Sequence, residues 1–248
     1  MIIAAALCPS PPLLIPGLTG SASVLPELRL ACEQAVAELV AAAPDIVAVV
    51  GSGDQTMIWD AAARLDLAAF APGIGGAVLA PGDDPQEPPA TDRGSGLPMS
   101  LGIGGWLLDQ ARYGGERLLQ SVAHREPAQR CVGLGADLAA TPAKIALLVL
   151  ADGSACRNPK APGYFDERSA GFDHEVERAV RDGDLGALSV IDVALADELM
   201  ATGRPAWQVL AGALDDGRLT SEIRYCDDPF GVAYLVASLR VELSRAGR

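Results

Sequence analysis

The stretch LLVLADGSACRNPKAPGYFDERSAGFD, residues 147–173, decides the fold that we predict for this chain. It begins inside an apolar run over 145–150, which has the length and composition of a buried strand. The run ends abruptly in a polar turn at 152–154, and open α/β sheets bind ligands just outside the carboxyl ends of their strands. A proline-rich loop follows, and Asp166 opens a helix. We therefore expect this loop to form one wall of a site.

Apolar residues over 2–7 and 46–50 predict buried strands over 2–7 and 45–50. The first strand is followed by a rigid proline-rich loop at 8–12, and the second ends in a polar turn at 51–54. Residues 81–96, rich in Pro, Gly and acids, predict a long surface loop. Ser23 is a candidate N-cap for the first helix. Helices are predicted over 24–42, 97–112, 166–182, 191–202 and 205–213, short strands around 130–132 and 222–226, and a final helix or strand running to Leu243. No linker divides the chain, so one α/β domain over 1–248 is expected.

Composition excludes several classes of partner. The chain has 248 residues, 50% of them hydrophobic, with a formal net charge of −13. That charge argues against binding to nucleic acid phosphates or to an anionic membrane surface. The five cysteines include no CxxC pair, which favours free thiols in a reducing compartment. No apolar run reaches the roughly 18 residues of a membrane span, and we expect a soluble, cytoplasmic protein.

Three separated segments carry a family resemblance. They are CPSPPLLIP at 8–16, ADGSACRNPKAPGYFDERSAGFD at 151–173 and EIRYCDDPFGVAY at 222–234. In this order they resemble the class III extradiol ring-cleavage dioxygenases, whose LigB-like fold is shared with the Memo-type proteins. The resemblance implies a single domain with a central mixed β-sheet flanked by helices.

The resemblance also implies a metal site that this sequence cannot assemble. Enzymes of the family hold Fe(II) with two histidines and one glutamate, and a further histidine acts as acid/base. Here Ser10 stands at the first histidine position, Asp54 or its neighbour Gly53 at the second, and Ala155 at that of the acid/base. Glu222 matches the glutamate, but the whole chain contains two histidines.

We therefore predict a degenerate family member that has lost iron-dependent ring cleavage, needs no cofactor, and keeps its cleft for a small molecule or a protein partner. Asp152 and Ser154 are the candidate catalytic residues. Ser10, Arg157 and Lys160 are candidate ligand-binding residues, because the two cations suit a small anion or an aromatic acid. The competing interpretation is that the cations pair with neighbouring acids such as Asp166 or Glu167. The cleft is predicted to be bounded by Ser10, Asp54, Asp152, Ser154, Arg157 and Glu222.

The alternative is an active enzyme with a carboxylate-based metal site. Asp54 and Glu222 would hold the metal and Asp152 would act as acid/base, a donor set that suits Mg²⁺, Mn²⁺ or Ca²⁺ better than an oxygen-activating iron. Metal-free hydrolytic or isomerising chemistry in an acidic cleft is a second version. Asp54 and Asp152 can instead cap turns through backbone N–H groups.

The remaining reactive side chains favour structural roles. His124 lies in a polar connection and is expected to be solvated, and His174 is expected to point outward from its helix. Cys8 and Cys156 can approach each other in the cleft, but without a nearby base they are expected to be inert. The Ala- and Leu-rich helices over 191–202 and 205–213 suggest an apolar face and a homo-oligomer.

Overall fold

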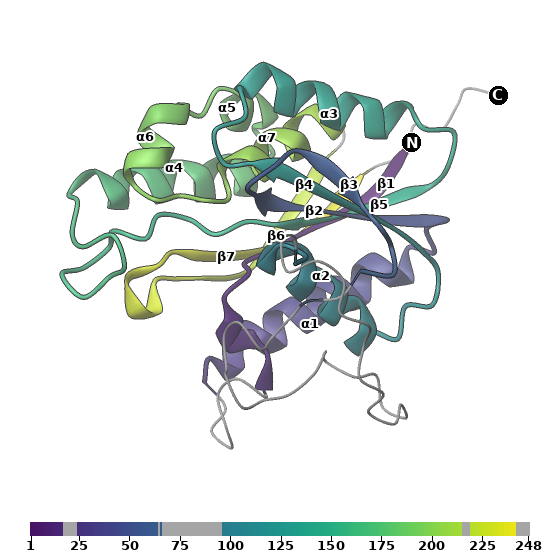
Figure 1. The fold of residues 1–248 in the computed structure, drawn as a ribbon, viewed down its shortest axis with the longest axis horizontal. Helices are drawn as coiled ribbons and strands as arrows, with labels where there is room; N and C mark the ends of the chain where they lie inside the picture. Colours follow the sequence, from purple (N-terminus) through teal and green to yellow (C-terminus); the bar gives the residue numbers. More distant parts are fainter. Residues whose placement is uncertain (17–23, 64, 66–95, 215–218, 242–248) are drawn as a thin grey trace.

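One seven-stranded sheet, in the order β3-β4-β2-β5-β1-β7-β6, forms the centre of the computed structural model (Figure 1). The structure describes residues 1–16, 24–63, 65, 96–214 and 219–241. Neighbouring pairs among β4, β2, β5 and β1 are parallel, whereas β3, β7 and β6 pair antiparallel. The strands are β1 (Ile2–Cys8), β2 (Ile46–Gly53), β3 (Met57–Trp59), β4 (Glu116–Ala123), β5 (Ile145–Leu150), β6 (Leu219–Asp227) and β7 (Tyr234–Val241). The prediction of an α/β domain with a mixed sheet is confirmed.

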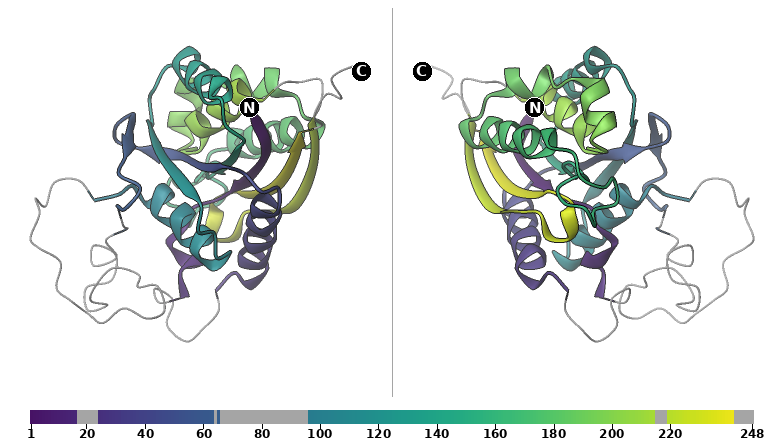
Figure 2. Two further views of the ribbon diagram at one scale, coloured as in Figure 1. Left: turned by 90° about the vertical axis from the view of Figure 1, so that its right-hand side faces the viewer. Right: turned by 90° about the vertical axis from the view of Figure 1, so that its left-hand side faces the viewer.

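Helices cover both faces of the sheet. α1 and α2 lie on one face, and α3 to α7 lie on the other, as the views in Figures 1 and 2 show. The helices are α1 (Pro26–Ala41), α2 (Met99–Gln110), α3 (Ala128–Ala140), α4 (Arg168–Asp182), α5 (Leu185–Ser189), α6 (Val193–Glu198) and α7 (Arg204–Ala213). Strands β1 and β5, which are covered on both faces, are apolar along their whole length.

Strand β5 shows how the core is divided. Ile145, Leu147 and Val149 belong to the hydrophobic cluster under α4 to α7, and the alternate residues belong to the cluster under α1 and α2. Every residue of β5 is buried. The predicted strand over 145–150 is therefore correct at both ends, and its polar continuation emerges at one edge of the sheet.

The region from 114 to 140 departs from prediction. The short strand expected around 130–132 is wrong, because these residues lie inside α3. A Cβ atom added to Gly135 would lie 2.1 Å from the carbonyl oxygen of Val209 in α7, so the two helices pack with backbones nearly in contact. This packing overrides the local preference of Arg130-Cys131-Val132 for an extended conformation. Strands β3 and β4 and the short α5 were not anticipated.

Other boundaries move for local reasons. Helix α1 begins at Pro26, two residues later than predicted, because proline favours the first helical turn and Leu25 adopts a left-handed φ of 58°. The predicted cap Ser23 lies outside the described residues, as does all of the predicted 81–96 loop except Gly96. The undecided C-terminal segment is strand β7, which pairs with β1 and β6.

The cysteines are free, and four of the five are buried, as expected for inert thiols. The expected approach of Cys8 and Cys156 is wrong, since they belong to hydrophobic clusters on opposite faces of the sheet. Helix α7 buries nine residues and offers no apolar face for an oligomer. Among the described helices, none has the length and apolar content needed to cross a bilayer.

Candidate functional site

A cavity of about 460 Å³ opens at the carboxyl ends of β1, β2, β4 and β5. Parallel strands end at the same edge of a sheet, so the residues that follow them converge there. The polar lining residues are Ser10, Ser52, Asp54, Gln55, Ser100, His124, Asp152 and Thr202; the others are Gly53, Met57, Trp59, Gly96, Pro98 and Met99. We call this space the first chamber.

The Ser10–Asp152 pair forms one side of the first chamber. The backbone N–H of Ser10 donates to Asp152 Oδ1 at 2.9 Å, and the Ser10 hydroxyl donates to Oδ2 at 2.8 Å. The two residues follow β1 and β5, which are neighbours in the sheet, and Ala151 N–H donates to the Cys8 carbonyl at 2.8 Å between them. Asp152 is thus held by β1 and does not cap its own turn.

The Asp152 carboxyl group has a pKa shifted in the direction that suits proton exchange. Burial raises the pKa of its carboxyl group, and the two hydrogen bonds from Ser10 oppose that rise. A carboxyl group with a raised pKa in a polar cavity is a candidate acid or base. The burial of Asp152 and its raised pKa are therefore compatible with the predicted catalytic role of this residue.

His124 borders the same cavity, a placement that its sequence context did not reveal. The side chain of His124 is exposed, as expected. The residue follows β4 directly, lines the cavity, and its backbone N–H donates to the Gly53 carbonyl at 3.2 Å. Its position after a strand matches that of Asp54 after β2 and Asp152 near the end of β5. That signal was missed because β4 itself was not recognised.

A buried arginine holds the turn that carries His124. Arg204, only 1% exposed, donates from Nη1 to the Glu126 carbonyl at 2.6 Å and from Nη2 to the His124 carbonyl. Thr56 also donates to the Glu126 carboxylate. The turn at 124–126 is therefore attached to the core from two sides.

The first chamber also has apolar lining residues. Met57, Trp59, Pro98 and Met99 line it. The Trp59 Nε1–H donates to the Ser121 hydroxyl at 2.7 Å. Its only polar side-chain atom is thereby satisfied within the protein, and the indole contributes apolar surface to the chamber.

Ser154 and Arg157 lie outside the described lining. Ser154 is fully buried, and its N–H and hydroxyl both donate to Asp173, the former at 2.8 Å. Arg157 Nε lies 2.8 Å from Asp228 and 3.7 Å from Asp173. These hydrogen bonds and ion pairs hold the 152–166 loop against α4 and against the β6–β7 connection. Arg157 does pair with acids, but not with the two that we anticipated.

Two further predicted residues do not reach the cavity. Lys160 is exposed on the loop, and in the described part of the chain its ammonium group forms no ion pair. Glu222 lies on edge strand β6 and pairs with Arg224 at 3.3 Å and Arg240 at 3.8 Å. It is therefore not brought to Asp54, and no group of three or more His, Cys, Asp or Glu side chains suited to a metal occurs among the described residues.

The remaining predicted positions also lie elsewhere. Ala155, which stands at the family's acid/base position, is buried outside the described lining and its N–H donates to the Leu199 carbonyl at 3.0 Å. His174 is 70% exposed and points outward, as predicted.

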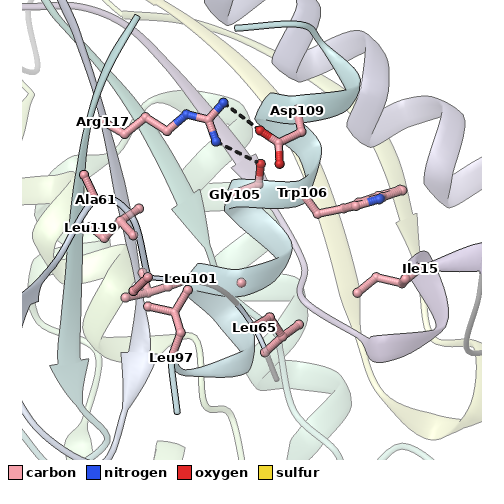
Figure 3. A pocket seen from close by; sticks show the side chains of 12 residues that line it. Ile15, Ala61, Leu65, Leu97, Leu101, Gly105, Trp106, Asp109, Arg117 and Leu119 are labelled. Atoms are coloured by element: carbon pink, nitrogen blue, oxygen red, sulfur yellow. Dashed lines mark hydrogen bonds and ion pairs between the residues drawn. The ribbon is translucent and has the colours of Figure 1, made fainter. Parts of the chain in front are cut away.

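A separate hollow on the α2 face is too small for an organic ligand. In Figure 3, Arg117 of β4 pairs with Asp109 of α2 at 2.8 Å and donates to the Gly105 carbonyl at 3.4 Å, above apolar side chains that include Leu97 and Leu101. Its volume is about 40 Å³, close to the space of a single water. This hollow is a packing feature of the α2–β4 contact.

Comparison with known proteins supports the fold alone. The chain matches no protein-family model, and it matches no curated protein sequence. It is similar in structure to the uncharacterized protein JW3007 from Escherichia coli K12, with a TM-score of 0.53 and 14% sequence identity. The similarity covers 96% of this chain and 99% of that one, so both proteins share the arrangement of the whole α/β domain.

Proposed function

We propose that this protein binds a small molecule in the first chamber and does so without mononuclear iron chemistry. The observation that carries the proposal is the Ser10–Asp152 pair, at the strand ends where an α/β sheet binds ligands. The pair satisfies both donors of Ser10, while each carboxylate oxygen keeps a further lone pair for a ligand.

The charges of the lining favour a neutral or cationic ligand. Asp54 and Asp152 line the first chamber, and the described lining includes no Lys or Arg side chain. Arg157 and Lys160, on which the expectation of an anionic ligand rested, lie elsewhere. A ligand that donates hydrogen bonds and presents an apolar surface to Trp59 and the methionines would match the chamber best.

The iron site implied by the family resemblance does not fit these residues. It needs two histidines and a glutamate, but His124 is the only imidazole in the described lining, and Glu222 is engaged at the sheet edge. Asp152 is already bound by Ser10. We therefore propose a degenerate relative of the extradiol dioxygenases, and we derive no chemical step through a metal.

A second candidate function is metal-free acid/base catalysis in the same chamber. The specific observation in its favour is the raised pKa of Asp152 in a cavity that His124 also borders. Asp152 in its ionised form would accept a proton from the ligand, and in its protonated form it would return one. This candidate shares the binding mode proposed above and adds turnover.

The proposal is tested with three probes that share one ring and differ in charge: benzylamine, benzyl alcohol and benzoate. Thermal unfolding is measured for the wild-type protein and for Asp152→Asn. We expect benzylamine and benzyl alcohol to raise the Tm of the wild type and benzoate not to, because a ligand that binds only the folded state stabilises it. Asp152→Asn is expected to weaken benzylamine more than benzyl alcohol.

Opposite results are equally informative. Stabilisation by benzoate alone would overturn the charge argument and restore the anionic ligand. Stoichiometric iron in the protein after anaerobic loading, with oxygen consumed in the presence of a catechol, would overturn the degenerate interpretation. A variant that cannot fold would show itself in the far-ultraviolet circular dichroism spectrum, and Ser10→Ala then replaces it as the probe of the same pair.

A further inference from the structure

A second hollow, of about 490 Å³, continues from the first chamber. The two share Asp54, His124 and Thr202 as lining residues, so the same side chains form the boundary between them. The second chamber is otherwise lined by Ala123, Arg125, Ala196, Asp197, Met200 and Ala201. Because they share these three residues, we treat the two chambers as one cleft, which offers more space than a ligand confined to the Ser10–Asp152 pair requires.

Carboxylates occur at intervals along this cleft. Asp152 lies in the first chamber, Asp54 at the shared boundary and Asp197 in the second chamber. Methionine side chains lie in both, Met57 in the first and Met200 in the second. A pattern of separated negative charges with apolar surface between them is complementary to a chain of ammonium groups separated by methylenes.

We propose, resting on the function proposed above, that the two-chamber cleft binds a linear polyamine. Its terminal ammonium group would pair with Asp152, an internal one with Asp54 and the far end with Asp197. Trp59 also lines the first chamber, and its indole is the aromatic ring that cations prefer. The methylene segments would lie against the methionine and alanine side chains.

In the second chamber, the Asp197 carboxylate is already paired with an arginine. Arg125 donates to Asp197 from Nε at 3.1 Å and from Nη2 at 2.6 Å, but its side chain is 78% exposed. The contact is bidentate, but water and salt screen an exposed pair, so an ammonium group can compete with the guanidinium for this carboxylate. Arg125 therefore acts as a competitor for the same carboxylate.

An anionic ligand in the second chamber would give a different result in the same test. If the second chamber takes an anionic tail, Arg125 would bind it and Asp197 would repel it. Removing the charge of Arg125 therefore changes the affinity in opposite directions for the two ligands. This makes Arg125→Gln the most informative substitution in the cleft.

The experiment compares putrescine, a short diamine, with spermine, a long polyamine, by isothermal titration calorimetry at fixed ionic strength. We expect Arg125→Gln to strengthen spermine binding at least about threefold and to leave putrescine within about twofold. The matched control is Arg178→Gln, which removes one positive charge from an exposed pair with Asp182 on α4. It corrects for the general attraction of a polycation to an acidic chain.

A steric variant tests the second chamber independently of charge. Ala123 lines only that chamber and is half-buried at the end of β4. Ala123→Phe is expected to weaken spermine binding about tenfold and to change putrescine binding less than about twofold. Ala140→Phe, at an exposed position at the end of α3, is the control for adding an aromatic ring.

The outcomes separate the two proposals. If putrescine binds and loses affinity in Asp152→Asn, but spermine binds no tighter and ignores both cleft variants, the polyamine inference is wrong and the small-molecule site stands. If Arg125→Gln does not strengthen spermine, and succinate titrated in the same way binds the wild type but is weakened by Arg125→Gln, the second chamber takes anions and the polyamine inference is wrong. If neither amine binds, the polyamine inference is wrong, and the three ring probes decide whether the first chamber binds a neutral ligand.

Discussion

Replacing Asp152 with alanine is expected to lower the free energy of unfolding by about 2 kcal/mol. The carboxylate accepts from the Ser10 N–H at 2.9 Å and from its hydroxyl at 2.8 Å, and Ser10 is only 8% exposed. Removing the acceptor leaves both donors unpaired, at about 1–3 kcal/mol for a buried group. The lower half of that range applies because water in the adjoining cavity can replace part of the loss. For a chain of this size the Tm should fall by roughly 4–8 °C.

Asp152→Asn separates hydrogen bonding from charge. The asparagine carbonyl can accept from the Ser10 N–H, and its amide can donate to the Ser10 hydroxyl, so we expect a loss under about 1 kcal/mol at mildly acidic pH. Burial raises the pKa of Asp152, so the folded state favours its protonated form. The stability that this group contributes is present below its unfolded pKa and is lost as the pH rises through its folded pKa.

The assay is urea unfolding of the wild type and Asp152→Asn from about pH 4 to pH 7, a range above the ordinary aspartate pKa of about 3.9. Other acids titrate in both proteins and cancel in the difference. We expect the advantage of the wild type over Asp152→Asn to shrink steadily as the pH rises. A difference that stays constant, or an asparagine variant as unstable as the alanine variant, would refute this account of the pair.

Three further predictions concern packing, the loop anchor and thiol chemistry. Gly135→Ala should destabilise the protein by about 2–4 kcal/mol, because its Cβ would lie 2.1 Å from a backbone carbonyl oxygen of α7. Gly133→Ala on the same helix meets no atom within 4 Å and should raise the free energy of unfolding by about 0.5–1 kcal/mol; urea unfolding measures both effects. Asp173→Ala should cost about 2–3 kcal/mol by leaving the two donors of buried Ser154 unpaired, with unchanged stability as the contrary result. Of the five cysteines, Cys226 alone is exposed, and partial burial raises the pKa of its thiol. Alkylation of the native protein should therefore be slow and confined to this one cysteine, whereas the denatured protein should be alkylated at all five.

The core strands β1, β2 and β5 were predictable from the sequence because the apolar residues within each strand already indicate that it is buried. The runs at 2–7, 46–50 and 145–150 are apolar without alternation, which is typical of strands covered on both faces. The polar turns after the second and third runs predicted that Asp54 and Asp152 follow the carboxyl ends of strands. These inferences depend only on residues adjacent in the chain.

Elements that depend on a distant partner were not predictable in this way. The Arg130-Cys131-Val132 segment is helical because Gly135 lets α3 approach α7, and nothing within α3 itself records that approach. Strand β3 has three residues, and its pairing with β4 is what defines it. Without β4, the position of His124 at a strand end could not be inferred.

The sequence by itself determined the fold class and the lack of enough histidines for an iron triad, and it predicted a site at the strand ends. Only the tertiary structure decided which polar residues share a cavity. It joined Ser10, Asp54, His124 and Asp152, and it turned Ser154, Arg157 and Glu222 toward partners of opposite charge or toward hydrogen-bonding groups elsewhere. The physical reason is that a charged side chain goes to the counter-charge within reach of its rotamers, and that distance is set by strand order and loop path rather than by separation along the chain.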